Sequence, residues 1–90
     1  MVNEQAKIKE LKAKGYQKVY AWDAEPNEED PDHTHPFDTH LVVISGEILI
    51  KMDKYNKTLR SGDEVEIPKE TVHYGLVGAK GCKYIVAERH

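Results

Sequence analysis

The chain of 90 residues has a single cysteine, Cys82, and no long hydrophobic run. One cysteine cannot form a disulfide within the chain, which is typical of proteins from a reducing compartment. No apolar stretch approaches the ~18 residues that a membrane-spanning helix needs. The N-terminal stretch is charged and contains no hydrophobic signal core. We therefore expect a cytoplasmic protein that has no membrane partner.

The chain also lacks an excess of positive charge and any internal repeat. Its formal net charge is −3, and its lysines are spread along the sequence instead of clustered. Non-specific nucleic-acid binding depends on a basic surface, so we expect no nucleic-acid partner. A chain of this length forms one domain, which buries roughly 60–65% of its unfolded surface. We predict one domain over residues 1–90, with a helix in 1–15 and a barrel in 16–88.

One helix is predicted near the N-terminus, over residues 3–14. Asn3 can cap it, Ile8 and Leu11 share one face, and Gly15 ends it. The apolar stripe of this helix is narrow, so we expect it to contribute only modestly to the core.

Short strands and turn signals fill the rest of the chain. The predicted strands are 16–22, the segment from 33 to 44, 48–52, 57–60, 64–67, 73–77 and 82–88. The predicted turns are 45–47, 53–56, 61–63 and the GAKG segment 78–81. Many short strands with a single helix predict an all-β sandwich or barrel.

A proline-broken acidic loop, residues 24–32, precedes the histidine-rich segment. It is either a solvated connection or part of a site whose field it shapes. In the second case an acidic side chain would lie at the mouth of that site, the candidates being Glu25, Glu28, Glu29 and Asp30.

Four of the five histidines gather around two strand-like units: His33, His35, His40 and His73. His33 and His35 are two residues apart, so on an extended strand they point to the same face. Imidazole is the commonest metal ligand among side chains. Two histidines from one strand and His73 from another would hold an ion from one side and leave positions open for water or substrate.

Strand parity separates His40 from this group. If His33 and His35 point inward, Thr39 and Leu41 follow, and His40 points outward. A one-residue bulge near Pro36 would invert the pattern and bring His40 or Asp38 to the ion. We therefore predict His33, His35 and His73 as metal ligands and keep His40 as a tentative fourth. The alternative is that the His-x-His pattern is a chance feature of a solvent-facing strand.

Two spaced motifs carry these histidines. The first reads His33-Thr34-His35, three residues, Thr39, six residues and Gly46. The second begins at Gly62 and continues through five residues to Pro68 and then to His73. The two motifs resemble those of the cupin superfamily, which are small jelly-roll barrels that hold a metal on histidines from both motifs. The resemblance spans residues 16–88 and implies a single jelly-roll barrel.

Three positions depart from the family pattern. Thr39 stands where the first motif has glutamate, Glu70 where the second has glycine, and Val77 where it has asparagine. Without the glutamate the chain is similar to three-histidine cupins, which include oxygenases acting on thiols and diketones. It is also similar to small single-domain cupins that have no assigned activity. Thr39, Asp38, His40 or water could fill the glutamate position.

Two function classes follow. The first is a metal-dependent enzyme acting on a small molecule, oxygenase-like or isomerase-like, with Fe, Mn, Ni, Cu or Zn as its divalent metal. The second is a non-catalytic module that binds a small ligand or a metal. Asp38, Tyr74 or Glu70 could act as the general base of the enzyme. We expect Cys82 to be buried, and we expect the aromatic side chains Trp22, Phe37, Tyr74 and Tyr84 to serve mainly in packing.

A homodimer is expected from the segment 41–44, which is apolar on both of its faces. An antiparallel sheet usually leaves one face polar. Because the N-terminal helix is narrow, a second copy of the chain would have to cover the remaining apolar face.

Overall fold

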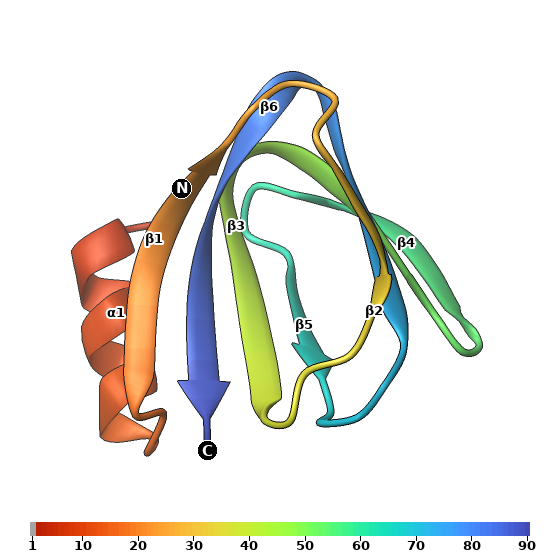
Figure 1. The fold of residues 1–90 in the computed structure, drawn as a ribbon. Coiled ribbons are helices and arrows are strands. Elements are labelled where there is room, and N and C mark those ends of the chain that lie inside the picture. Colours follow the sequence, from red (N-terminus) through yellow and green to blue (C-terminus); the bar gives the residue numbers. More distant parts are fainter. Residues whose placement is uncertain (1) are drawn as a thin grey trace.

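The computed structural model describes residues 2–90 and contains one helix and six strands (Figure 1). In chain order these are α1 Glu4–Ala13, β1 Lys18–Ala24, β2 Glu29–His33, β3 Asp38–Met52, β4 Tyr55–Arg60, β5 Glu64–Ile67 and β6 His73–Arg89. The predicted all-β class with a short N-terminal helix is confirmed. In the described part of the chain, no helix has the length and apolar character to cross a membrane.

Two long antiparallel strands, β3 and β6, form the frame of the molecule. Their pairing begins with Asp38 opposite Arg89 and continues to Met52 opposite His73. One half of this ribbon is flanked by β1, on β6, and by β5, on β3. The other half is flanked by β2, on β6, and by β4, on β3. Because the ribbon bends in the middle, the two halves face each other as the layers of a jelly-roll barrel (Figure 1).

The bend corrects two predictions, because neither residues 45–47 nor residues 78–81 form a chain-reversing turn. The register moves from Gly46 opposite Cys82 to Ile48 opposite Val77, so a bulge in β6 opposes a single residue of β3. Gly46 has φ +75°, and a Cβ built on it would lie 2.1 Å from the carbonyl oxygen of Gly81. Glycine therefore lets the two strands bend together instead of ending them.

A third correction concerns the acidic loop, because β2 lies within the segment 24–32 that was predicted to be irregular. The strand pairs with β6 alone and is irregular between Asp30 and His33. Pro31 cannot donate a ladder hydrogen bond, and it is tolerated because β2 is an edge strand. Acidic and proline residues concealed the strand, since both are rare in strands.

The hydrophobic core has two parts, on opposite faces of β3. The inner part fills the barrel and includes Leu41, Val43 and Ile48. The outer part lies under α1, where Leu11, with 2% of its surface exposed, packs on Val42. The helix therefore covers the second apolar face within one chain, contrary to the expectation that it was too narrow. The homodimer stays a prediction, although the apolar outer face of β3 no longer requires a second copy of the chain to cover it.

The ends of α1 agree with the sequence. The side chain of Asn3 accepts a hydrogen bond from the backbone N–H of Ala6 at 2.9 Å, as an N-cap does. Gly15 follows the helix with φ +96°, a conformation that favours glycine after a helix C-terminus.

Candidate metal centre and its pocket

Three of the predicted ligands lie together inside the barrel. His33 ends β2 and His73 begins β6, and the two residues are direct partners in the antiparallel ladder. His35 follows β2 by two residues, in the connection to β3. One ring nitrogen from each histidine lies within 4.8 Å of the others. The pairing of β2 with β6 thus brings residues 40 positions apart in sequence to a single point.

Backbone contacts orient two of these rings. Nδ1 of His33 lies 2.6 Å from the carbonyl oxygen of Pro31, and Nδ1 of His73 lies 2.9 Å from that of Thr71. A carbonyl oxygen can only accept, so Nδ1–H must donate in both rings, which leaves Nε2 as the nitrogen that can bind a metal. Metal-ligating histidines are commonly held this way. The ring of His35 stacks on Phe37, with centroids 5.0 Å apart and planes 14° apart.

The surroundings also keep two of the imidazoles neutral, the form that binds metal. Burial, and then the nearby rings of His73 and His33, lower the pKa of His35. Burial is the main cause that lowers the pKa of His73. The hydrogen bond to Thr71 opposes this shift, and the nearby ring of His33 adds to it. The donor set of three imidazoles therefore fits a divalent transition metal.

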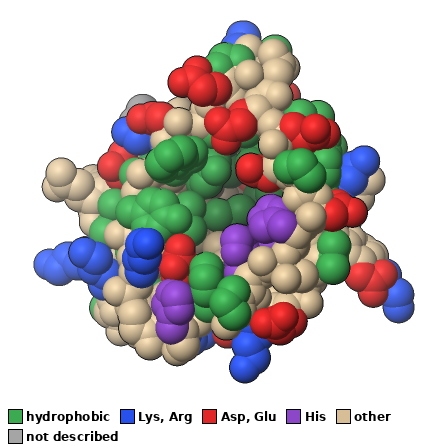
Figure 2. All heavy atoms as spheres, viewed as in Figure 1, with side chains coloured by type: hydrophobic (Ala, Val, Ile, Leu, Met, Phe, Trp, Pro, Cys, Tyr) green, Lys and Arg blue, Asp and Glu red, His purple; other side chains and the backbone are tan. Residues whose placement is uncertain are grey.

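The three histidines line a pocket of about 350 Å³ that opens on the face shown in Figure 2. There hydrophobic side chains line a hollow, with histidine on one side and acidic side chains around its rim. The wall also contains aromatic, aliphatic and polar side chains, among them Tyr20, Trp22, Phe37, Thr39, Leu41, Ile48, Ile50, Ile67, Tyr84, Val86 and Glu88. A volume of this size suits a small organic molecule.

Strand parity is as predicted on β3. Thr39 and Leu41 line the pocket, and His40 points to the opposite face. Thr39, in the family's glutamate position, has 5% of its surface exposed, and its hydroxyl oxygen has no hydrogen-bond partner in residues 2–90. A buried hydroxyl without a partner is uncommon in folded proteins.

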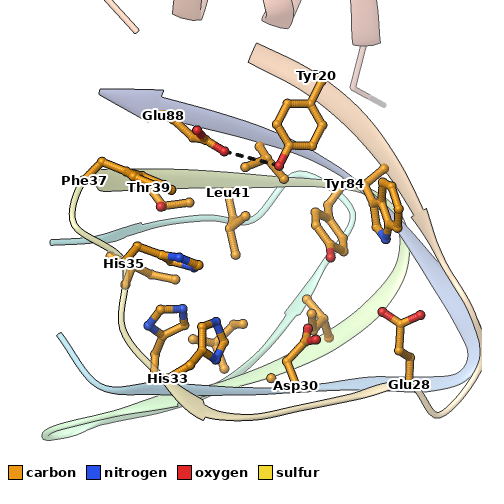
Figure 3. Close-up of a pocket in the computed structure, with 17 residues that line it drawn as sticks. Tyr20, Glu28, Asp30, His33, His35, Phe37, Thr39, Leu41, Tyr84 and Glu88 are labelled. Atoms are coloured by element: carbon orange, nitrogen blue, oxygen red, sulfur yellow. Dashed lines mark hydrogen bonds between the residues drawn. The ribbon is translucent and has the colours of Figure 1, made fainter. Parts of the chain in front are cut away.

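Glu88 is a pocket residue that sequence reasoning missed. It lies opposite Thr39 in the ladder, has 7% of its surface exposed, and lines the pocket (Figure 3). Its carboxylate accepts from the hydroxyl of Tyr20 at 3.3 Å and contacts Nε2 of His90 at 3.0 Å. The available signal was alternation, because Glu88 shares its strand face with Tyr84 and Val86, an otherwise apolar series.

The acidic segment contributes Glu28 and Asp30 to the pocket wall. Of the two alternatives for this segment, the one that places acidic side chains at the site therefore applies to these two residues. Both lie near Tyr84 (Figure 3), whose pKa is raised by burial first and then by Asp30 and Glu28. Glu29, between them, instead accepts a hydrogen bond from Tyr74 outside the pocket.

Of the four aromatic residues that were expected to serve mainly in packing, three line the pocket and Tyr74 does not. Trp22, Phe37 and Tyr84 line the pocket, and Trp22 has half of its surface exposed. Cys82 is buried in the inner core as predicted, and burial raises the pKa of its thiol to about 11.

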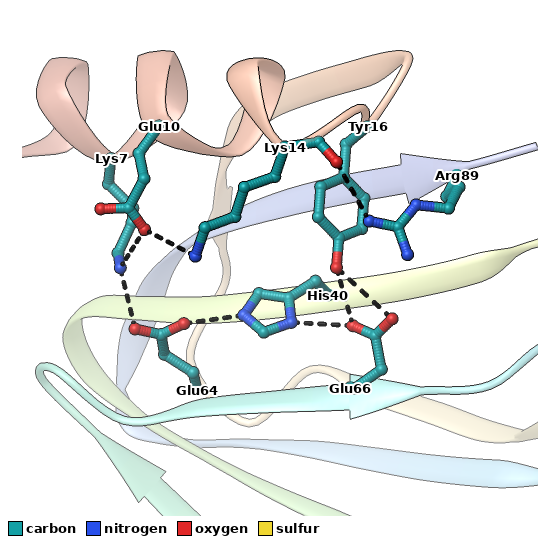
Figure 4. A network of polar contacts seen from close by, with 8 residues as sticks. All are labelled: Lys7, Glu10, Lys14, Tyr16, His40, Glu64, Glu66 and Arg89. Carbon is teal, nitrogen blue, oxygen red and sulfur yellow. Dashed lines mark hydrogen bonds and ion pairs between the residues drawn. The ribbon is translucent and has the colours of Figure 1, made fainter.

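His40 is not brought to the histidine group, which corrects its tentative assignment as a fourth ligand. No bulge inverts β3 near Pro36, so the side chain points away from the pocket. It lies between two carboxylates of β5, 2.7 Å from Glu64 and 2.8 Å from Glu66 (Figure 4). Asp38 shares this parity and accepts from the backbone of Lys69. Of the candidates for the glutamate position within the chain, only Thr39 faces the pocket.

The suggested general bases are also elsewhere. Asp38 lies on the outer face, and the hydroxyl of Tyr74 is bound to Glu29. Glu70 is exposed, and the described contacts of this residue are through its backbone N–H, which donates to the carbonyl of His35.

The His40 network predicts a loss of stability in acid. Partial burial alone would raise the pKa of Glu64, but hydrogen bonds from His40 and Lys7 more than offset this, so the pKa lies below its ordinary value of 4.5. A depressed carboxyl pKa stabilises the fold above the unfolded value, and the stabilisation is lost as pH falls below about 4.5.

Glu64→Gln should therefore cost about 0.5 kcal/mol at pH 7, an amount limited by solvent screening of this partly exposed group. The difference in the free energy of unfolding between this variant and wild type, measured by urea unfolding, should become smaller below pH 4.5. Glu25→Gln, at an exposed position, is the control. It should change neither the free energy of unfolding at pH 7 nor its dependence on pH. An equal cost for Glu64→Gln at pH 7 and pH 3 would contradict the assignment.

Comparison with known proteins identifies the family. The family model described as "Cupin domain" matches residues 21–87. No curated protein matches the chain. Among solved structures, a cupin-2 domain containing protein from Shewanella frigidimarina is 26% identical with a TM-score of 0.67, over 80% of this chain and 69% of the other. A cupin-like protein from Thermotoga maritima is 27% identical with a TM-score of 0.70, over 79% of this chain and 55% of the other.

More distant structures share the fold and include an enzyme. The DMSP lyase DddQ from Ruegeria pomeroyi is 22% identical with a TM-score of 0.73, over 80% of this chain and 37% of the lyase. Since the match spans little more than a third of the lyase, it speaks for the barrel alone. The family model covers most of the chain, and both its motif histidines and its barrel are present. The chain belongs to the cupin family.

Proposed function

We propose that this cupin is a metal-dependent enzyme acting on a small organic molecule. The observation that carries the proposal is the placement of three imidazole nitrogens within 4.8 Å in the wall of a pocket of about 350 Å³. His33, His35 and His73 would hold a divalent transition metal. Three ligands from one side leave positions free, and a bound metal there supplies Lewis acidity or a centre for oxygen chemistry.

The chain itself supplies a group for proton transfer. Glu88 is buried in the pocket wall, and its carboxylate accepts a hydrogen bond from the hydroxyl of Tyr20. A positioned carboxylate of this kind can take a proton from a substrate and return it. The exposed ring of His90 contacts the same carboxylate, which gives a route for that proton to solvent.

A binding module without catalysis is the second candidate. The observation in its favour is Thr39, because the family's glutamate is replaced by a side chain that is a poor metal ligand. In that case the same pocket would hold a small ligand or a metal, and no residue would be required to move a proton.

Metal analysis and turnover distinguish the two. Protein purified without a nickel column should contain one divalent metal per chain, and oxygen uptake should be measured on a panel of thiols and diketones. Glu88→Gln should retain the metal and lower any turnover by at least about 100-fold. Full metal occupancy with no turnover on the panel favours the module. Protein that contains no metal and cannot be loaded with one contradicts both the metal-dependent enzyme and the metal-binding module.

A further inference from the structure

The pocket is strongly biased in charge. Three acidic residues line it, and no lysine or arginine belongs to its described wall. A divalent ion on neutral histidines would be outweighed by the three carboxylates, so the wall stays formally negative when metal is bound. Apart from a bound metal, the described wall offers an anionic ligand no cation to pair with, whereas an organic cation would be attracted to the carboxylates.

Two of the acidic side chains are also free to bind. Within residues 2–90, neither Glu28 nor Asp30 makes an ion pair or a side-chain hydrogen bond. Both are partly buried, where an unpaired carboxylate is costly. Glu88, by contrast, is already engaged by Tyr20 and His90. The free carboxylates therefore lie along β2 and its approach, beyond the histidines.

Aromatic rings accompany these carboxylates. Tyr20, Trp22 and Tyr84 line the same pocket, and Figure 3 shows Tyr84 facing Asp30. Trp22 is half exposed and therefore presents part of its ring to solvent beside the pocket. Lys18 reaches only the ring of Tyr20, with Nζ 5.3 Å from the centroid, and does not line the pocket. Aromatic faces beside carboxylates are suited to organic ammonium groups.

The other end of the pocket presents different chemistry. There the unpartnered hydroxyl of Thr39 lies on the side of the histidines, away from Glu28 (Figure 3). This buried oxygen needs a hydrogen-bond partner that residues 2–90 do not supply. A ligand with a positive charge at one end and a hydroxyl group at the other would match the two ends of the pocket, with its hydroxyl group beside the wall that Thr39 and the histidines form.

We infer that the pocket binds a small organic cation of the amino-alcohol class, with its ammonium group at Glu28, Asp30 and Tyr84 and its hydroxyl group toward Thr39 and the histidines. The inference deepens the proposed function, because it assigns the substrate class of the same pocket. It requires only the wall described here, so it can be tested by binding, with and without metal.

The test compares probes of equal shape and different charge. Zinc-loaded and metal-free protein are each titrated with three probes of similar shape. These are choline, the neutral alcohol 3,3-dimethylbutan-1-ol, in which a tert-butyl group replaces trimethylammonium, and the carboxylate 3,3-dimethylbutanoate. A second pair is 2-aminoethanol and propanol. The indole N–H resonance of Trp22, the one tryptophan of the chain, reports binding. We expect at least one cation to bind about tenfold more tightly than its neutral partner, and the carboxylate to bind most weakly to the metal-free protein.

Variants assign the preference to residues. Glu28→Gln combined with Asp30→Asn should bring the cation and its neutral partner to within about twofold. Glu29→Gln is the matched control, because the intervening side chain lies outside the pocket, and it should keep the wild-type preference. Glu28→Gln alone should give an intermediate value if the double variant does not fold.

Two outcomes overturn the inference: neutral partners that bind as tightly as both cations, or no binding by either cation. The first would mean that the acidic wall serves only to offset the charge of the metal. Zinc binding without a cation preference rejects the inference and leaves the proposed function intact. A cation preference in protein that binds no zinc rejects the metal-dependent function and leaves the inference standing.

Discussion

His35→Ala is expected to lower the affinity of the protein for zinc by more than about 100-fold without unfolding the barrel. Removing even an outer partner of a metal ligand typically costs 10- to 100-fold, and this variant removes one of only three imidazoles. The ring lies in a connection between β2 and β3, so the layers of the barrel do not depend on it. Titration calorimetry measures the affinity, and the melting temperature reports on the fold.

The matched control is His40→Ala, which removes an imidazole from the opposite face of β3. This variant should keep the zinc affinity of wild type while losing the contacts to Glu64 and Glu66. An unchanged affinity in His35→Ala would show that this ring is not a ligand. A large loss in His40→Ala would mean that the parity of β3 differs from the structure.

Gly46→Ala is expected to destabilise the protein by about 2–5 kcal/mol. The φ of +75° costs a residue with a side chain about 1–2 kcal/mol. The added Cβ would also lie 2.1 Å from the carbonyl oxygen of Gly81 and 2.9 Å from Cα of Cys82, and such overlap costs about 1–3 kcal/mol. Small domains are stable by only about 5–15 kcal/mol, so urea unfolding should show a large shift.

Gly62→Ala isolates the steric part of this cost. Gly62 has φ +91°, but among the described residues no atom lies within 4 Å of the position that a Cβ would take there. Its replacement should cost only the backbone term, about 1–2 kcal/mol. Equal costs at positions 46 and 62 would show that β3 and β6 do not approach closely at the bend.

Much of the site was predictable because it depends on period and spacing. Residues two apart on an extended segment share a face, which placed His33 with His35 and Thr39 with Leu41. The same rule placed His40 outside. The two motifs carried the resemblance that related His73 to the other two histidines, a long-range contact that no local pattern could supply.

The remaining features depend on pairing between distant strands. Glu88 lines the pocket because it lies opposite Thr39 in the ladder, and this register cannot be predicted from the sequence of either strand alone. Glycine at 46 and 81 resembled turn signals, yet the partner strand continues past both, so the chain bends instead of reversing. The helix α1 contributes more to the core than its sequence predicts, because Leu11 packs with residues from β3 and β6.

Anomalous diffraction from a crystal soaked in zinc tests the central claim most directly. We expect one strong peak inside the barrel, about 2.0–2.1 Å from a ring nitrogen of each of His33, His35 and His73. A peak between His40 and the carboxylates of Glu64 and Glu66, with none at the three histidines, would contradict it.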